Sequence, residues 1–228
     1  GRSAGIILAL ICVYRLSDFV LNIMNPFYLD LGFTKTEIAE VRKVFGVAMS
    51  LLGVFAGGLA IARWGVMRSL LVGALAGPLT NLAFAWLATR GHDIGALFVA
   101  IGTDNVASGF GGTCLIAYMS SLTSSGFTAT QYALFSSLYS LPGKLLASQS
   151  GRIVEASARS AEQGGAFAPL ASLFAGLPEG AFVTGSAAAG VAPASLGAGY
   201  VAFFGYSCLV GVAAVALTVI VARRSPDP

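Results

Sequence analysis

Four polar side chains interrupt the first long apolar segment of the sequence: Arg15, Asp18, Asn22 and Asn25. Their spacing of three or four residues would place them on one face of an α-helix. A charge at the middle of a bilayer costs at least about 2.5–3.5 kcal/mol, so this face should meet a polar cavity or charged partners. The alternative is a self-neutralising Arg15–Asp18 pair. The two amides extend the stripe beyond what such a pair needs, which favours a functional role for this face over simple neutralisation.

A second polar group lies in a later apolar segment, where Asp104 and Asn105 are followed by Ser108 on the same helical face. Lys144 lies in the next apolar segment and has the opposite charge, so an Asp104–Lys144 bridge is one possible pairing. A carboxylate that changes its proton or its partner can couple transport to a proton gradient. Asp18 and Asp104 are therefore the candidates for proton coupling. A static bridge that fixes helix register is the alternative.

Proline and glycine interrupt two of the apolar segments, and such positions often mark bending helices in transporters. Pro142 and Gly143 precede Lys144 directly and are the hinge candidates, whereas Pro78 is read as a simple kink. Three tyrosines could stack on a sugar, although tyrosines in membrane helices more often pack: Tyr118, Tyr132 and Tyr139.

The composition places these groups in a membrane protein. Apolar residues make up 56% of the 228 residues and charged residues only 10%, whereas soluble domains carry about 25% charged residues. The 29 glycines fit membrane helices, in which small residues allow close packing. Two GxxxG pairs lie within apolar segments, Gly53 with Gly57 and Gly73 with Gly77. We therefore expect an all-α membrane protein.

Six apolar segments are long enough to approach the roughly 20 residues that cross a bilayer. They cover residues 6–29, 44–62, 69–89, 94–122, 129–154 and 196–222. The connections between the early segments are short and polar, including residues 32–43. Residues 1–154 should hold five transmembrane helices and residues 196–228 the last one with a short basic tail. Residues 155–195 are rich in Ala, Gly, Ser and Pro and predict a partly ordered insertion at the membrane surface, or a short re-entrant helix.

Several other functions are disfavoured by the sequence. The net charge of +3 is small and scattered, so nucleic acid is not an expected partner. The three cysteines (Cys12, Cys114 and Cys208) are far apart, and the chain has a single histidine, His92, so neither a metal site nor a cofactor is expected. No HExxH or GxSxG motif is present, and the chain is predicted not to be an enzyme.

Two stretches resemble known transporter families. Residues 58–68 resemble the short cytoplasmic loop of the major facilitator superfamily, with Ala62 in place of its usual acidic residue; the matching residues are Gly58, Arg63, Gly65 and Arg68. Residues 104–113 (DNVASGFGGT) and 127–134 (FTATQYAL) resemble the AmpG-type muropeptide permeases and the related acetyl-CoA transporters. The Arg-x-x-Asp at residues 15–18 also resembles the start of the seventh helix of AmpG-type proteins. The resemblance covers about residues 10–155.

This resemblance implies a proton-driven symporter of the bacterial inner membrane that imports anhydro-muropeptides for peptidoglycan recycling, the process linked to β-lactamase induction. It implies a central pathway that includes Arg15, Asp18, Asp104, Gln131 and Lys144, and it places both termini in the cytoplasm. Facilitator-type carriers consist of two six-helix halves. Six predicted spans in a chain that starts at Gly1 therefore predict the C-terminal half, with an N-terminal six-helix half as its partner. The alternatives are a carrier of acetyl-CoA or another solute, and a membrane assembly subunit that transports nothing.

Overall fold

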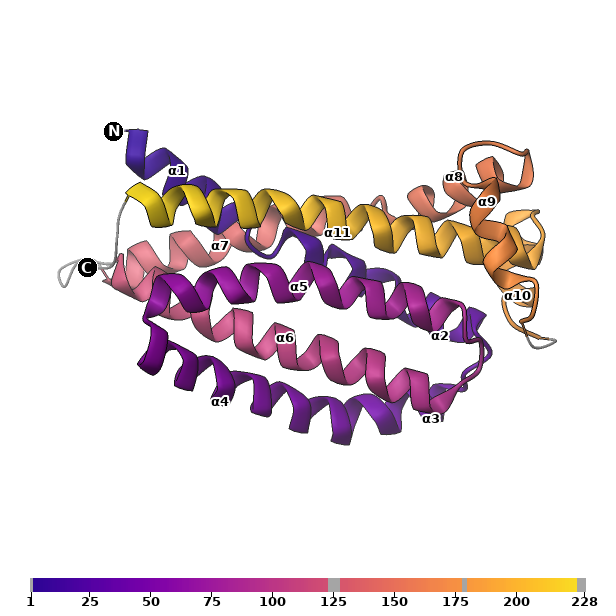
Figure 1. Cartoon of the computed structure of the whole chain (residues 1–228), viewed down its shortest axis with the longest axis horizontal. Coiled ribbons are helices and arrows are strands. Elements are labelled where there is room, and N and C mark those ends of the chain that lie inside the picture. The colour runs from indigo at the N-terminus through magenta and orange to yellow at the C-terminus, as the bar shows by residue number, and fades with distance from the viewer. Residues whose placement is uncertain (1, 123–127, 178–179, 225–228) are drawn as a thin grey trace.

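A computed structural model describes residues 2–122, 128–177 and 180–224 of the chain. Helices account for 86% of the protein, and the described residues contain no strand. The long helices run roughly side by side and form an elongated bundle, with a group of short helices at one end (Figure 1). The predicted all-α membrane fold is confirmed.

The first apolar segment is broken and is not the single helix predicted over residues 6–29. It consists of α1 (Arg2–Val13), the 3-10 helix η1 (Leu16–Ile23) and α2 (Met24–Asp30). Arg15 precedes η1 with a non-helical backbone (φ −105°, ψ 20°). A 3-10 helix has three residues per turn instead of 3.6, so positions 15, 18, 22 and 25 do not share one face. The predicted continuous polar stripe is therefore wrong.

The second segment is longer than predicted. A single 30-residue helix covers Lys35–Trp64 and is made of α3 (Lys35–Glu40), the π-helical turn η2 (Val41–Gly46) and α4 (Val47–Trp64). It begins with a capping box, in which Glu37 N–H donates to Thr34 Oγ1 (3.2 Å) and Thr34 N–H donates to Glu37 Oε2 (2.7 Å). Most of the predicted polar connection over residues 32–43 is therefore helical, because this cap starts the helix early.

The third and fourth segments lie almost where they were predicted, as α5 (Val66–Ala88) and α6 (Ile94–Ser121). Gly65 joins α4 to α5 with φ 82°, a conformation that side chains with a Cβ rarely adopt. Asp93 caps α6, since its Oδ1 accepts a hydrogen bond from Ala96 N–H (3.0 Å).

The fifth predicted segment, residues 129–154, is two helices rather than one. α7 (Thr128–Ala147) ends before a turn at Ser148 and Gln149, and α8 (Ser150–Glu162) then extends the chain by a more polar helix. Much of the predicted insertion at residues 155–195 is also helical, in α8 and in three short helices: α9 (Ala168–Ala171), η3 (Ser172–Phe174) and α10 (Val183–Ala189). The last helix is α11 (Pro193–Arg224).

Within the described residues, four helices are long and apolar enough to cross a membrane: Lys35–Trp64, Val66–Ala88, Ile94–Ser121 and Pro193–Arg223. The broken first segment and α7 lie against these helices, and a count of six spans stays a prediction. α1 begins and α11 ends at the same end of the bundle (Figure 1). Large apolar side chains point outward from the long helices, with Phe55 72% and Leu209 70% exposed, as expected of a surface that faces lipid.

Glycines allow the long helices to approach closely. A Cβ at Gly57 would lie 3.0 Å from the Phe110 carbonyl oxygen of α6, and a Cβ at Gly53 would overlap the Val106 carbonyl oxygen. Gly73 makes a similar crossing between α5 and α6, where a Cβ would lie 3.0 Å from Gly111 Cα. Both GxxxG pairs therefore contain glycines at helix crossings.

The short helices are attached to the bundle through the backbone carbonyl of Asp30 and the carboxylate of Glu162. Tyr200 of α11 donates a hydrogen bond to Asp30 Oδ2 (2.7 Å), and Phe182 N–H donates to the Asp30 carbonyl oxygen (2.5 Å). Glu162 accepts a hydrogen bond from Ala192 N–H (3.0 Å) just before α11 begins. Hydrogen bonds from Ser195 and from Ala192 hold the pKa of Glu162 below its usual value.

The glycine crossing predicts opposite effects of one substitution at two positions of α4. Gly53→Ala should destabilise the protein by about 1–3 kcal/mol, because its Cβ overlaps the backbone of α6. Gly58 has open space around it, so Gly58→Ala should be neutral or slightly stabilising, since alanine restricts the unfolded chain. Thermal unfolding of the purified protein in detergent measures both. Equal melting temperatures for the two variants would contradict this account of the α4–α6 contact.

Candidate functional site

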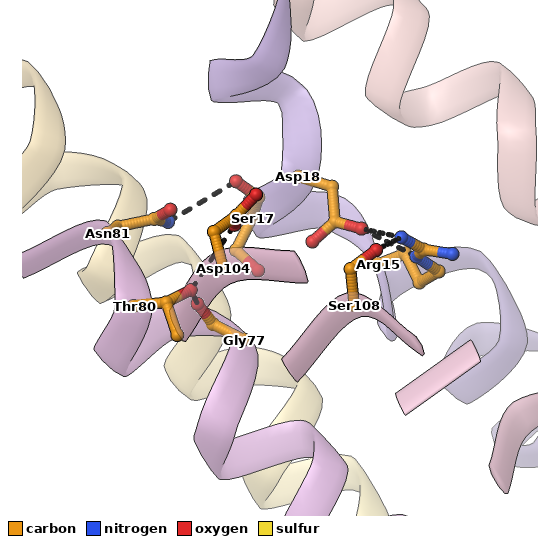
Figure 2. Close-up of polar contacts among 8 residues, drawn as sticks. All are labelled: Arg15, Ser17, Asp18, Gly77, Thr80, Asn81, Asp104 and Ser108. Atoms are coloured by element: carbon orange, nitrogen blue, oxygen red, sulfur yellow. Dashed lines mark hydrogen bonds and ion pairs between the residues drawn. The ribbon is translucent and has the colours of Figure 1, made fainter. Parts of the chain in front are cut away.

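A charged cluster links η1 to α6 in the middle of the bundle. Arg15 donates through Nε to Asp18 Oδ2 (2.5 Å) and through Nη2 to Ser108 Oγ (2.7 Å). Figure 2 shows the guanidinium facing both the Asp18 carboxylate and the Ser108 hydroxyl. Both charged side chains are about a quarter exposed, so the pair is partly shielded from its surroundings. The predicted Arg15–Asp18 pair therefore exists, and it also connects two elements.

Asp104 lies beside this cluster and is held by α5 (Figure 2). The Thr80 hydroxyl donates to the Gly77 carbonyl oxygen (2.8 Å) and lies 3.4 Å from Asp104 Oδ1. Asn81, one residue further on α5, donates to the Ser17 carbonyl oxygen of η1 (3.4 Å). Two polar side chains of α5 therefore face α6 and η1, which brings these three elements together around Asp104.

The two carboxylates share a small cavity of about 20 Å³ with the Arg15 guanidinium. Thr80 and Ser108 also line it, and the small residues Gly73, Gly77, Gly111 and Gly112 form much of the remaining wall. This charge cavity has room for about one water molecule with several polar partners. The structure thus brings both predicted proton-coupling residues, Asp18 and Asp104, to one enclosed polar space.

The two amides of the predicted stripe lie elsewhere. Asn25 accepts a hydrogen bond from Arg42 Nη1 (2.9 Å) and lines a groove of about 410 Å³ between α2 and the start of the second helix. Three basic residues line this basic groove: Lys35, Arg42 and Lys43. Asn22 lines a different pocket, together with Asp30. The change from 3-10 to α-helical geometry at Met24 turns these side chains to different sides.

The remaining predicted pathway residues do not gather at the charge cavity. Asn105 donates to the carbonyl oxygen of Ile101 in its own helix (2.8 Å) and lies against Gly46 of η2. Lys144 is exposed on α7 and, among the residues that the structure describes, forms no ion pair. The possible Asp104–Lys144 bridge is therefore wrong, because Asp104 faces α5 and η1 instead. Gln131 lies on α7 and is partly buried.

Other predicted positions have simple structural surroundings. Tyr118 is buried in an apolar cluster with Leu10 and Tyr14, so it packs and does not line a sugar site, while the side chains of Tyr132 and Tyr139 lie outside the described residues. α7 continues through the hinge candidates Pro142 and Gly143. The loop-motif residues Gly58, Arg63, Gly65 and Arg68 lie at the end of α4 and the start of α5, with both arginines exposed.

Several residues of these sites were not singled out from the sequence as site residues, among them Lys35, Arg42, Lys43, Thr80 and Asn81. Thr80 and Asn81 follow Pro78 in an apolar run, and their polarity was the one available signal. The sequence analysis assigned Arg42 to a polar connection. The available signal that it belongs to a helix was its position two to three turns after the capping box at Thr34.

Comparison with curated proteins gives significant matches, whereas no family model matches the chain. "Putative transporter AmpG 4" of Rickettsia felis is 37% identical over 149 residues, which is 65% of this chain and 36% of that protein. "Putative transporter AmpG 3" of Rickettsia prowazekii is 38% identical over 147 residues. "Putative transporter AmpG 1" of Rickettsia bellii is 35% identical over 150 residues. The matched part of the chain spans about a third of the length of these relatives.

These matches agree with the all-α membrane fold and its four helices that could span a membrane. The predicted resemblance to AmpG-type permeases is confirmed: the chain is a multi-pass membrane protein that is similar in sequence to proteins named as putative AmpG transporters.

Proposed function

We propose that this chain is the C-terminal six-helix half of a proton-coupled transporter of the bacterial inner membrane, which imports anhydro-muropeptides from the periplasm into the cytoplasm for peptidoglycan recycling. The similarity to AmpG-named transporters over about a third of their length supports a half-permease. The observation that carries proton coupling is the charge cavity, in which two carboxylates meet one guanidinium.

The charge count in this cavity explains why a proton would bind there. Arg15 neutralises one carboxylate, and its partner in the structure is Asp18. Asp104 has a threonine hydroxyl but no basic side chain as its hydrogen-bond partner among the contacts described. A second negative charge in a membrane-embedded, poorly hydrated space is unfavourable, and a proton removes it.

Proton binding would alter the contacts that hold η1. When one carboxylate is protonated, the guanidinium can form an ion pair only with the other. The residue that binds the proton, Asp18 or Asp104, therefore cannot be the ion-pair partner of Arg15 at the same time. Arg15 also contacts Ser108 of α6, and Asn81 of α5 contacts the backbone of η1. A change of partner at Arg15 would therefore move the 3-10 segment relative to α5 and α6. Alternating access requires a movement of this kind between packed elements.

The basic groove supplies a site for the anionic part of a substrate. Arg42, Lys43 and Lys35 line one wall, and the apolar side chains of Leu29 and Ile38 lie beside them. Peptide carboxylates of a muropeptide suit this combination of guanidinium and ammonium groups. The phosphates of acetyl-CoA would suit it as well, which makes acetyl-CoA the alternative substrate.

Uptake by the full permease tests this proposal. Vesicles that contain it should accumulate radiolabelled anhydro-muropeptide when the outside is acidic, and unlabelled acetyl-CoA should not compete. Asp104→Asn should lower uptake to the level of vesicles without the permease, because the neutral amide cannot release or bind the proton. The protein should still insert, as measured by its amount in the membrane.

Asp93→Asn is the matched control for this substitution. It makes the same chemical change on the same helix, outside the membrane-spanning part, and asparagine caps a helix about as well as aspartate. Its uptake should equal that of the wild type. Lack of uptake by the wild type, with or without a pH gradient, would overturn the transport proposal. An Asp104→Asn variant that loses assembly rather than uptake would indicate an assembly subunit.

Neutralising the Arg15–Asp18 pair distinguishes a functional pair from a structural one. Arg15→Gln or Asp18→Asn alone leaves a charge without its partner and should lower stability by about 1.5–3 kcal/mol. The double variant Arg15→Gln/Asp18→Asn should recover most of that stability in thermal unfolding but remain unable to transport. Wild-type uptake by the double variant would mean that the pair only fixes the contact between η1 and α6.

Removing a charge from the basic groove should affect binding more than turnover. Arg42→Gln should raise KM about tenfold or more with a smaller change in kcat, because a charge-assisted hydrogen bond to the substrate is lost. Arg90→Gln removes the same charge from the α5–α6 connection, outside the groove, and should leave KM unchanged. Equal KM values for the two variants would exclude the groove as a substrate site.

A further inference from the structure

A second pocket, of about 420 Å³, lies where α8 and α10 pack against α2 and α11. It is separate from the charge cavity and shares no lining residue with it or with the basic groove. The short helices form part of its wall, at the end of the bundle opposite to the start of α1 and the end of α11 (Figure 1). Its lining is more polar than that of a packing defect between apolar helices.

The charged side chains that line this acidic pocket are both carboxylates, Asp30 and Glu155. Arg159 reaches Glu155 from the next turn of α8, but at 3.6 Å and with both side chains more than half exposed. Such a surface pair contributes little and leaves the carboxylate open to a second partner. The amide of Asn22 adds a further polar group to the lining.

Asp30 is positioned by the surrounding helices. Tyr200 donates to its Oδ2 (2.7 Å), and Gly185 of α10 makes room for the carboxylate, since a Cβ at that position would lie 2.5 Å from both of its oxygens. One hydrogen bond from a phenol does not neutralise a half-buried carboxylate. The other lone pairs of Asp30 can therefore accept hydrogen bonds from a donor in the pocket.

Ser150 is an independent sign of a ligand. It lines the same pocket, is only 2% exposed, and its Oγ has no hydrogen-bond partner within the described part of the chain. Buried hydroxyl groups are nearly always hydrogen-bonded, so a partner that is not part of the protein is expected here. A serine hydroxyl can accept a hydrogen bond from the same donor that the carboxylates attract.

We propose that the acidic pocket binds the ammonium group of a small organic amine, with Asp30 and Glu155 as its counter-ions and Ser150 and Asn22 as hydrogen-bond partners. The volume lies within the range of pockets for small organic molecules and is far larger than a bare inorganic cation needs. An ammonium group has three donors and no acceptor, which matches a lining of carboxylates, a hydroxyl and an amide oxygen.

The same chemistry fits two sources, an amino group on a transported solute or a separate amine that binds at the surface. The proposal does not depend on the proposed transport, because it is tested by binding alone. Competition between the amine and solute uptake then distinguishes the two sources. An amine that is displaced by the solute shares its site, and one that is not displaced is a separate ligand.

Calorimetric titration of the protein in lipid nanodiscs tests the proposal with 1,5-diaminopentane as the probe. Binding should be saturable, and neither 1,5-pentanediol nor glutarate, which match the probe in length but lack the positive charge, should bind. Glu155→Gln should weaken binding about tenfold or more, because a charge-assisted hydrogen bond is lost. Glu40→Gln removes an exposed carboxylate of α3 that lines none of these pockets and should leave the affinity unchanged.

The substitution Ser150→Ala distinguishes a role of this hydroxyl in binding from a purely structural role. Without the amine it should raise the melting temperature or leave it unchanged, because it removes a buried hydroxyl that has no partner. With the amine it should weaken binding. The proposal would be overturned if the probe showed no saturable binding or if the diol bound equally well. It would also be overturned if Glu155→Gln and Glu40→Gln had equal effects, or if millimolar sodium chloride displaced the probe.

Discussion

Arg15 brings a full positive charge into a bundle built mainly from apolar side chains, and its guanidinium has to be paired there. The pairing is made with Asp18 three residues along the chain and with Ser108 on α6. The backbone at Arg15 leaves the helical conformation, and the following turn is a 3-10 helix. The position of η1, the break in the first segment and the contact with α6 all accompany this one partly buried charge.

The rest of the bundle leaves a narrow polar space around that charge. Gly73, Gly77, Gly111 and Gly112 line the charge cavity and allow α5 and α6 to lie close to η1. Larger side chains at these positions would fill the cavity or separate the helices. The small residues thus serve two purposes, because they let the helices pack and they keep the space between the two carboxylates small.

The sequence predicted the uninterrupted apolar segments well and the charged ones less well. The predicted segments 69–89 and 94–122 end within a few residues of the ends of α5 and α6. Each is a long apolar run that follows a clear start signal, Gly65 before α5 and the Asp93 cap before α6, so few other structures are possible. Residues 6–29 were read with α-helical spacing, which correctly paired Arg15 with Asp18 but wrongly placed Asn22 and Asn25 on the same face. The 3-10 turn depends on contacts with α5 and α6, which local spacing does not contain. For the same reason, the contact between Asp104 and Thr80 could not be read from the sequence.

α2 connects the charge cavity to both outer sites. It continues directly from η1, and its two sides differ. Asn25 and Leu29 line the basic groove, whereas Pro26 and Asp30, each one residue later, line the acidic pocket together with Asn22 of η1. A shift of η1 that follows a change of partner at Arg15 would therefore move one wall of each site at the same time. A short helix between two sites of opposite charge can move as a unit and so transmit such a shift without a change in its own structure. Proton binding and ligand binding would then influence each other through α2.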